Sequence, residues 1–595
     1  MVADPREEYH LRRNRWDAEW KILQRRSMVI GNWRLAIGIA AAVLAYLAFG
    51  VHKISGSVLL VPVAVFLAIA IYGARVSRRR TLAERALKFY DQGLARVEDR
   101  WPGTGEGGER FQNRDHLYAD DLDLFGNGSL FELVSRARTT AGESVLADWL
   151  MAPADLPTAA ARQEAVKELT ELLDLREDIA LLGEDIRAEV EIQAVTRWGS
   201  RPTRVFSKMT RVLVFALALA GIVALIAFLS QLVPLWPLLT ILLCDLVLAR
   251  VLRQHVLEAI RGIDTPAAGL RVLSLLLARL QHESFHSPRL KELHSEIAMQ
   301  GLDAAHRIAR LERWVEILDS SDNVLVRVIQ PLVLWREQSA MAIEAWRQVN
   351  GKFIGRWIAA IAEIESLSSI ASIAYERPSW RYPDLLGPED AEFDAVELKH
   401  PLLPQSRCVP NDLRLCRQTR LLIVSGSNMS GKSTLLRSVG LATVLAWAGC
   451  PVPVRTLRIS MWQTAASMRA NDSLQGNRSR FFAEISRIRA IVELACRVPT
   501  LFLLDEVLSG TNSHDRKIGA AAIMKKLVGC GAVGLITTHD LALADIEDEL
   551  RGSAQNVHFD DYISDGTIEF EFKLKPGIVT HSNALELMRS IGLEV

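Results

Sequence analysis

Long uncharged apolar stretches limit what this chain can fold into more than any other feature of its sequence. Residues 35–51 and 58–74 carry no charge, and residues 212–244 form a longer uncharged run with Pro234 and Pro237 near its middle. Because an α-helix rises about 1.5 Å per residue, each short stretch nearly crosses a bilayer core of roughly 30 Å. We therefore predict two transmembrane hairpins, the second turning at the prolines, and about four spans in all. The alternative for any one stretch is a helix buried in a protein core.

Basic residues lie next to these apolar stretches at the ends that are away from the predicted hairpin tips. The predicted tips carry only His52 and Lys53 in the first hairpin and no charge in the second. Positive charge favours the cytoplasmic side of a membrane. We therefore expect a multi-pass protein of the inner (cytoplasmic) membrane, with both termini and all large segments in the cytoplasm. The flanking basic residues are Arg25, Arg26, Arg34, Arg75, Arg78, Arg79, Arg80, Arg201, Arg204, Lys208, Arg211, Arg250 and Arg253.

Composition adds few constraints. The 595 residues are enough for several domains, and 70 basic residues balance 70 acidic ones, so the net charge indicates no particular partner. The six cysteines are scattered and contain no Cys-x-x-Cys pair. This spacing argues against a disulfide framework or a zinc site and fits a reducing compartment.

The remaining chain changes character after Pro383. Residues 81–210 and 256–376 read as helical, and apolar residues at three- and four-residue steps mark one buried helix face at Trp357, Ile361, Ile364, Leu367, Ile370 and Ile373. Arg377-Pro378 is expected to end that helix. Beyond Pro383 short apolar runs alternate with helical stretches, which is typical of an α/β nucleotide-binding domain.

A phosphate-binding loop is predicted at residues 426–434, "GSNMSGKST", between an apolar strand and a helix. Glycines let backbone N–H groups turn toward phosphate oxygens, and the helix points its positive end at the same anion. Lys432 supplies a charge for the β- and γ-phosphates, and the Ser433 hydroxyl is placed for Mg²⁺. The candidate ATP-binding residues are Gly426, Ser427, Asn428, Met429, Ser430, Gly431, Lys432, Ser433 and Thr434.

Two further strands end in polar side chains. Asp505 and Glu506 close "LFLLDE", and His539 follows the strand in "LITTHD". Asp505 is expected to hold Mg²⁺ with Ser433, and Glu506 to orient and deprotonate the attacking water. His539 is expected to meet the γ-phosphate or that water. Glu506 and His539 are therefore the predicted catalytic residues.

These motifs resemble the ATPase domain of the MutS family of DNA mismatch-repair proteins. The resemblance rests on "GSNMSGKST", "LDEVLSGTNSHD" and "TTHD", with "ELKHPLLP" (397–404), "RSRFFAEISRI" (478–488) and "LKPGIVTHSNALELMRSIGL" (574–593) around them. Residues 121–153 and 362–385 resemble the family's helical core and lever. The resemblance implies an ABC-like ATPase that works as a dimer, with ATP and Mg²⁺ as cofactors and DNA as partner. It also implies that Ser479, Ser509, Thr511 and Asp515 lie at the interface between two ATPase domains, and that His558 stacks on adenine.

Some features depart from the family pattern. Two predicted membrane helices stand where a mismatch-reading domain would precede the core, and Cys408 stands where mismatch-repair members place an aromatic residue under adenine. We find no obvious DNA-gripping insertion in the lever, and the chain ends at Val595 without the family's C-terminal dimerisation helices. A membrane-anchored member without mismatch recognition is therefore expected.

We accordingly predict a multidomain α and α/β protein with transmembrane helical hairpins, an all-α core and lever, and a C-terminal ABC-like P-loop ATPase domain. The expected function is a dimeric, membrane-anchored ATPase coupled to DNA binding; an ABC-type transporter and an ATP-switched scaffold that does not act on DNA are the alternatives. The predicted segments are a basic N-terminal arm (1–32), the first hairpin (33–75), the first part of the core (81–210), the second hairpin (211–250), the helical core and lever (251–385) and the ATPase domain (386–595).

Overall fold

The computed structural model packs the chain into two compact units. Unit 1 comprises Met1–Gly105 with Tyr375–Arg377, and unit 2 comprises Glu106–Ala374 with Pro378–Val595. The structure describes residues 4–51, 55–189, 192–202, 206–260, 267–298, 303–320, 330–427, 429–468, 480–508, 511–539, 543–550, 552–564 and 567–579.

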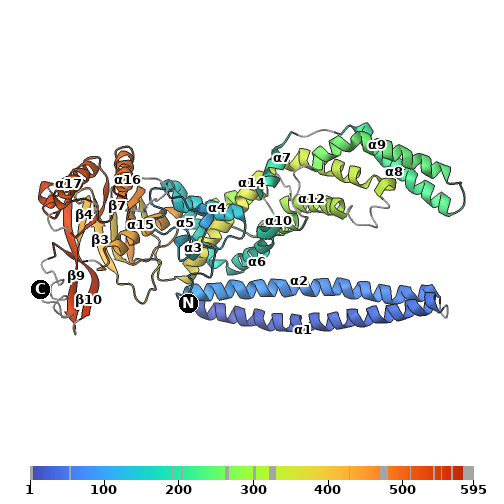
Figure 1. Ribbon diagram of the computed structural model, residues 1–595, viewed down its shortest axis with the longest axis horizontal. Coiled ribbons are helices and arrows are strands. Elements are labelled where there is room, and N and C mark those ends of the chain that lie inside the picture. The colour runs from blue at the N-terminus through green and yellow to red at the C-terminus, as the bar shows by residue number, and fades with distance from the viewer. Residues whose placement is uncertain are drawn as a thin grey trace. The chain divides into compact units, whose positions relative to one another are not determined.

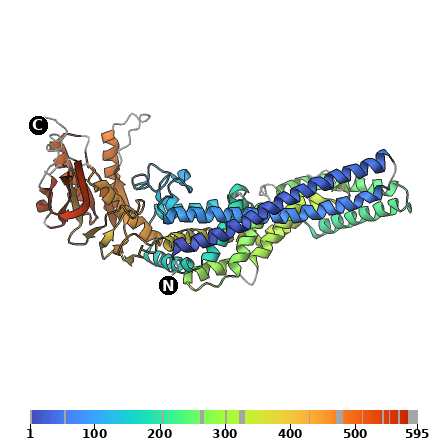
Figure 2. The ribbon, with the colours of Figure 1, turned by 90° about the horizontal axis from the view of Figure 1, so that it is seen from below.

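Two long helices make up most of unit 1. Helix α1 (Pro5–Ala45) continues into a π-helical turn (Tyr46–Gly50), and α2 (Leu60–Val97) returns alongside it (Figures 1 and 2). The Asp4 side chain caps α1, and Pro5 occupies its first turn. Leu23, Ile30, Val76 and Ala83 form the apolar seam between the two helices.

Tyr375–Arg377 is fixed to the base of this hairpin by buried polar contacts. Glu376, the last residue of helix α14 (Trp335–Glu376), forms an ion pair with Arg96 and accepts a hydrogen bond from the Tyr9 hydroxyl at 3.1 Å. Arg377 donates to Asp99 Oδ1 at 2.5 Å and to the Arg96 carbonyl at 2.6 Å. Buried charges need such partners, so this cluster specifies where the end of α14 attaches within unit 1.

The helices of unit 2 before residue 378 include a second hairpin and a long buried helix. Helices α8 (Lys208–Leu229) and α9 (Trp236–Ile260) are the predicted hairpin that turns near Pro234. The six apolar residues of the predicted stripe are all buried on α14, which ends immediately before Arg377-Pro378. The other helices of this region are α3 (Leu130–Val134), α4 (Thr140–Met151), α5 (Leu156–Glu171), α6 (Leu173–Glu189), α7 (Ile192–Ser200), α10 (Ala267–Gln281), α11 (Pro288–Ile297) and α12 (Ala304–Asp319).

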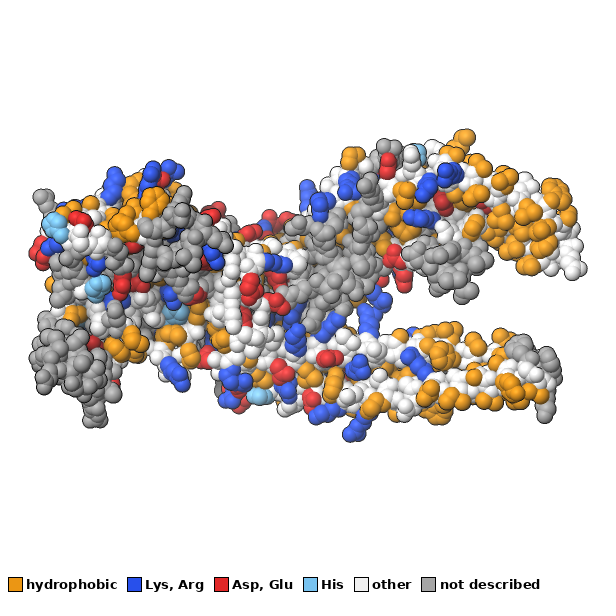
Figure 3. Space-filling model, viewed as in Figure 1, with side chains coloured by type: hydrophobic (Ala, Val, Ile, Leu, Met, Phe, Trp, Pro, Cys, Tyr) orange, Lys and Arg blue, Asp and Glu red, His pale blue; other side chains and the backbone are white. Residues whose placement is uncertain are grey.

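Among the described helices, four are long and apolar enough to cross a membrane by length and composition. In three of them, few residues of the most apolar 18-residue stretch are buried. The buried share is 6% in Pro5–Ala48, 11% in Leu60–Val97 and 22% in Lys208–Leu229. Figure 3 shows hydrophobic side chains gathered at the ends of both hairpins. The fourth helix is α14. Because 83% of its most apolar 18-residue stretch is buried inside the protein, α14 is a core helix. Because α9 carries Asp245, Arg250 and Arg253 and is not among these four, the predicted fourth span is not confirmed.

Several predicted segment boundaries do not coincide with helix ends. The predicted N-terminal arm and first span belong to one helix, α1, and α2 runs from the second span into the segment predicted as core. The sequence contains no proline between Pro5 and Pro62 and none between Pro62 and Pro102. Without a helix-breaking residue, helix formation continues from apolar to polar sequence.

A buried carboxyl group in the core makes stability depend on pH. Glu365 of α14 accepts hydrogen bonds from the Thr139 hydroxyl and, at 3.3 Å, from the Arg138 backbone N–H. Burial raises the pKa of Glu365 from its ordinary value of 4.5 to about 7, against these hydrogen bonds.

Replacing Glu365 with glutamine is therefore expected to flatten the pH profile of stability. Between pH 4.5 and about 7 the folded chain keeps a proton that the unfolded chain has lost, so the free energy of unfolding falls as pH rises through that window. The full effect above the window is roughly 3 kcal/mol at most. Unfolding temperatures of wild type, Glu365→Gln and the exposed control Glu493→Gln should be compared from pH 5 to pH 8. Parallel profiles for wild type and Glu365→Gln would contradict the expectation.

After Pro378 the chain forms two sheets with helices packed against them. A four-stranded sheet has the order β1 (Asp384–Leu386), β5 (Thr456–Ser460), β2 (Phe393–Leu398), β3 (Asn411–Leu415). A six-stranded sheet has the order β10 (Thr567–Pro576), β9 (Ala554–Ser564), β4 (Leu421–Ser425), β8 (Val533–Thr538), β7 (Thr500–Leu504), β6 (Gln463–Ser467). All its neighbours pair in parallel except β10 with β9. The helices are α15 (Lys432–Ala448), α16 (Arg480–Ala495), α17 (Ser513–Gly529) and α18 (Ile546–Glu549).

One pair of cysteines contradicts the expectation from their spacing. Cys496 directly follows α16, Cys530 directly follows α17, and the two form a disulfide with their Cα atoms 4.9 Å apart. The expectation of no disulfide framework is therefore wrong for this pair. Packing of α16 against α17 brings the two helix ends together, and the 34-residue separation in sequence gives no sign of it.

Candidate nucleotide site

The three predicted motif strands are neighbours in the six-stranded sheet. Strand β8 lies between β4 and β7, with Ser425 opposite Thr538 and Leu504 opposite Ile536. Every residue of β4, β7 and β8 is buried, which explains their largely apolar sequences. Because the strands are parallel, the segments that follow them meet at one edge of the sheet, where ligands of open α/β sheets bind.

The loop after β4 has the backbone of a phosphate cradle. Gly426 and Gly431 have φ angles of 150° and 104°, and Met429 has a φ of 73°. A Cβ atom on Gly426 would lie 2.8 Å from the Ser430 hydroxyl, so a side chain there would distort the loop. Gly431 precedes α15, whose first N–H groups have no partner within the helix. Asn428 lies outside the described residues.

Lys432 folds back over this loop. Its Nζ donates to the carbonyl oxygens of Gly426 and Ser427 at 2.8 and 2.7 Å. Burial lowers the pKa of Lys432, while Glu506 and Asp505 oppose that shift. The Ser427 hydroxyl is buried, and no described residue forms a hydrogen bond with it. A buried ammonium, an unpartnered hydroxyl and the free N–H groups of the helix start are donors that suit the phosphates of ATP.

Asp505 and Glu506 are held at the end of β7 by the neighbouring strands. The Thr537 hydroxyl donates to Asp505 Oδ1 and accepts from the Glu506 N–H at 2.9 Å, while the Asp505 N–H donates to the Ser467 carbonyl at 3.0 Å. Glu506 has a left-handed φ of 46°, an unfavourable conformation for a residue with a side chain. The carboxylates are hard oxygen ligands of the kind that Mg²⁺ prefers.

His539 lies between Glu506 and a residue that the sequence motifs did not identify. Its Nδ1 is 3.8 Å from Glu506 Oε1, and Arg516 Nη1 is 3.3 Å from its Nε2. Because an arginine can only donate, Nε2 is the accepting nitrogen and Nδ1 carries the proton that faces Glu506. Arg516, on α17, also donates to the carbonyls of Leu508 and Thr511. The sign of Arg516 in the sequence is its position directly after the motif "LDEVLSGTNSHD".

The predicted interface residues between ATPase domains are partly described. Ser479 and Ser509 lie outside the described residues. Thr511 is half-buried, and Asp515 is exposed at the start of α17, where Asn512 caps the Asp515 N–H at 2.9 Å. Glu484 of α16 accepts from the Leu508 N–H at 2.6 Å, so α16 and the loop after Glu506 are joined directly.

A cavity of about 160 Å³ lies beside the phosphate loop. Gly431 and Thr434 line it from the loop and α15, Cys408 from the segment before β3, and Phe559 and Phe572 from β9 and β10. The predicted adenine residue, His558, is not among the residues lining it. Its Nδ1 is 3.0 Å from the Gly577 carbonyl and its Nε2 is 3.2 Å from Asp560, so both ring nitrogens have partners within the β9–β10 hairpin. Phe572 is 41% exposed and offers an aromatic surface suited to a base, whereas Phe559 is buried; the sequence motifs pointed to neither residue.

The C-terminal part of the chain is similar to known proteins. The family model for MutS domain V matches residues 422–594. The chain is 30% identical over 290 residues to DNA mismatch repair protein MutS 2 of Halobacterium salinarum, covering 47% of this chain and 32% of that protein. It is 31% identical over 244 residues to DNA mismatch repair protein MutS of Aquifex pyrophilus, covering 40% and 28%. The matches thus span about a third or less of these relatives. Residues 422–594, which contain the phosphate loop, the two carboxylates and the histidine after adjacent strands, are thus similar to MutS domain V.

Proposed function

We propose that this protein is a membrane-anchored ATPase that binds and hydrolyses ATP with Mg²⁺ as a dimer and couples this cycle to DNA binding. The observation that carries the proposal is the meeting of the phosphate loop, Asp505, Glu506 and His539 at one edge of three adjacent parallel strands. MutS-family relatives named for DNA mismatch repair support the DNA component. An ABC-like domain arrangement is part of the proposal.

Each side chain has a role that follows from its position. Lys432 and the loop N–H groups bind the β- and γ-phosphates, and the Ser433 hydroxyl and Asp505 hold Mg²⁺, which would neutralise charge on the phosphate oxygens. Glu506 accepts the proton of the attacking water. His539, oriented by Arg516 through Nε2, offers its Nδ1 proton on the same side as Glu506. The Thr537 hydroxyl fixes the positions of Asp505 and Glu506 relative to each other, because it forms a hydrogen bond with each of them.

The dimer is proposed because the resemblance to the MutS family implies an interface between two ATPase domains. In this proposal Ser479, Ser509, Thr511 and Asp515 face the second chain, and Ser479 reaches its γ-phosphate. The contact between Glu484 and the Leu508 N–H supports this role, because it joins α16 to the loop that carries Ser509 and Thr511. His558 remains a proposed adenine contact; the apolar cavity with Phe559 and Phe572 is the alternative position for the base.

The membrane anchor is supported by the chemistry of the α1–α2 hairpin. Its apolar windows are almost fully exposed, and the exposed aromatic residues Trp33 and Tyr72 stand at their polar ends, where membrane proteins place interfacial anchors. Among the described residues no carboxylate pairs with the neighbouring exposed arginines, which suit anionic head groups. Those arginines are Arg25, Arg26, Arg75, Arg78 and Arg79. In cell fractionation the protein should stay in the membrane pellet after carbonate extraction; release into the supernatant would contradict the anchor.

ATP hydrolysis stimulated by DNA tests the central proposal. Detergent-solubilised wild type and Lys432→Ala should be assayed with homoduplex, mismatched, branched and single-stranded DNA at two salt concentrations. We expect one DNA structure to raise the rate of wild type, less so at the higher salt concentration because phosphate contacts are screened. A rate that is insensitive to every DNA would reject the DNA component and favour an ATP-switched scaffold. Nucleotide-dependent substrate flux in proteoliposomes would instead favour a transporter.

A further inference from the structure

A second cavity, of about 470 Å³, lies between helices α12 and α14 of unit 2, which run side by side (Figure 1). No carboxylate is among the described residues that line it. His306, Arg310 and Trp314 follow one another at four-residue steps on α12, so they share one face of that helix. The polar and aromatic lining residues are His306, Arg307, Arg310 and Trp314 of α12 with Trp346 and Asn350 of α14.

Hydrogen bonds between the two helices fix the width of this cavity. The Trp335 Nε1–H donates to the Ile317 carbonyl at 2.7 Å, and the Trp346 Nε1–H donates to the Arg307 carbonyl at 2.8 Å. The Arg307 guanidinium also donates to Asn350 Oδ1. A ligand would therefore meet walls that are already in place, which lowers the entropy lost on binding.

The two arginines of the cavity keep hydrogen-bond donors for a ligand. A guanidinium group has five N–H donors, and among the described residues only Asn350 accepts from the Arg307 side chain. Arg310 is exposed, and no described residue forms a hydrogen bond or an ion pair with its side chain. The nearby carboxylate Glu312 lies 3.9 Å from Arg271 of α10 and does not line the cavity. Two guanidinium groups without a competing carboxylate suit phosphate oxygens.

Trp314 adds an aromatic surface one helical turn after Arg310. It is half-buried and lines the cavity, so its ring forms part of the wall. Every nucleobase has a flat face that stacks on an aromatic side chain, and phosphates flank it along the strand. The cavity volume lies within the range of roughly 300–1,000 Å³ that is usual for pockets enclosing one small organic group. Bases inside a duplex are stacked on one another and cannot reach such a surface, so only an unpaired base fits.

We propose that the cavity between α12 and α14 binds an unpaired nucleotide of single-stranded DNA. The base stacks on Trp314, and the flanking phosphates bind Arg307 and Arg310. The indole ring favours this ligand over an anionic lipid head group, which would engage the arginines but has no planar ring to stack. None of the lining residues belongs to the cavity beside the phosphate loop. This inference rests on the DNA component of the proposed function and names the kind of DNA that is bound.

Fluorescence anisotropy of a labelled single-stranded oligonucleotide with the detergent-solubilised full chain tests this site. Arg310→Gln should raise Kd about fivefold, the upper range for an exposed ion pair. It should also make the plot of log affinity against log salt concentration less steep by about 0.7, because one phosphate contact is lost. Arg313→Gln is the matched control, since Arg313 is an exposed arginine of the same helix outside the cavity, and it should bind like wild type.

Trp314→Leu should raise Kd roughly 5- to 100-fold, the range for losing one stacked base, and leave the salt dependence unchanged. An abasic oligonucleotide of the same length keeps the phosphates and should bind wild type and Trp314→Leu equally. Trp314→Phe retains an aromatic face and should recover most of the affinity for the normal oligonucleotide. Circular dichroism would identify a Trp314→Leu variant that fails to fold, and the exposed Arg310 then carries the test.

The outcomes separate this site from the proposed function as a whole. Equal affinities of Arg310→Gln and Arg313→Gln, or of wild type for the normal and abasic oligonucleotides, would overturn the site while leaving DNA binding to another surface. Displacement of the oligonucleotide by an equal concentration of phosphatidylglycerol in mixed micelles would assign the arginines to a lipid head group and overturn it as well. Absence of binding of any DNA to wild type would overturn both the site and the DNA component.

Discussion

Glu506→Gln is expected to lower ATP hydrolysis roughly 10²- to 10⁴-fold, the range for loss of a general base, while ATP binding persists. Glutamine preserves the shape of the side chain and its position after β7 but cannot accept a proton from water. The Thr537 hydroxyl would still receive the backbone N–H of residue 506, so the strand end keeps its structure. Since the phosphate loop and Asp505 are unchanged, ATP and Mg²⁺ should still bind. Trapped ATP is then expected to hold two chains together.

This prediction is checked by steady-state hydrolysis together with size-exclusion chromatography coupled to light scattering in detergent. The variant should shift from monomer to dimer on addition of ATP and Mg²⁺ and remain a dimer. Wild type should become monomeric again as ATP is consumed. Glu493→Gln, an exposed carboxylate of α16 paired with Arg489, is the matched control and should match wild type. Wild-type turnover in Glu506→Gln would assign the base to a residue other than Glu506.

Lys432→Ala is expected to weaken ATP binding roughly 10- to 100-fold, the range for losing a charged hydrogen-bond donor, and to abolish measurable hydrolysis at cellular ATP concentrations. The ammonium is the only basic group of the loop 426–434 in the sequence, and it is already held over that loop by the carbonyls of Gly426 and Ser427. Alanine removes this charge without changing the glycines that shape the backbone. The site would then bind the phosphates through N–H groups alone.

Titration with a fluorescent ATP analogue measures the loss directly. Lys525→Ala provides the control, because Lys525 is an exposed lysine of α17 that pairs only with Glu549 among the described residues. Equal affinities of Lys432→Ala and wild type would remove the loop as the phosphate site and with it the proposed function. A loss of affinity in both variants would indicate a general effect of charge rather than a site.

Local sequence determined the parts of the site that depend on residue type within a few positions. The short, largely apolar runs before Gly426, Asp505 and His539 predict buried parallel strands, and parallel strands place the following residues at one edge. The glycine spacing of the loop follows from the φ angles that the turn requires. The apolar stripe on α14 and its end before Pro378 follow from helical periodicity and from the missing N–H of proline.

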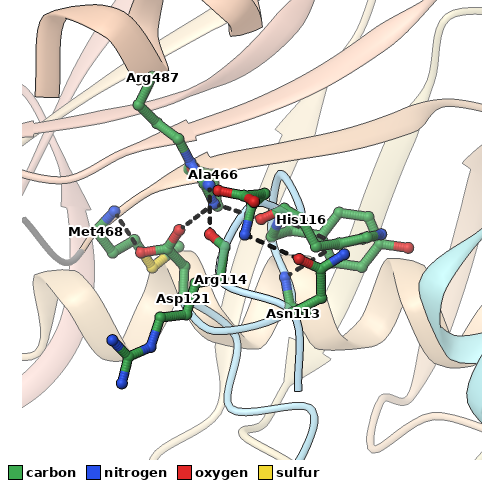
Figure 4. A network of polar contacts seen from close by, with 10 residues as sticks. Asn113, Arg114, His116, Asp121, Ala466, Met468 and Arg487 are labelled. Atoms are coloured by element: carbon green, nitrogen blue, oxygen red, sulfur yellow. Dashed lines mark hydrogen bonds and ion pairs between the residues drawn. The ribbon is translucent and has the colours of Figure 1, made fainter. Parts of the chain in front are cut away.

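The tertiary structure decided which distant residues meet. Arg516 reaches His539, Phe572 enters the cavity beside Gly431, and Asp121 binds Arg487 across 366 residues of sequence (Figure 4). It also showed that α14 is apolar because it is a core helix, and that Cys496 and Cys530 lie at adjacent helix ends. A sequence pattern shows the spacing of apolar residues and the side-chain chemistry within one helix or strand. Local sterics and hydrogen bonds determine that spacing. Contacts between elements depend on how whole faces pack, and that information is distributed over the chain rather than held in any one motif.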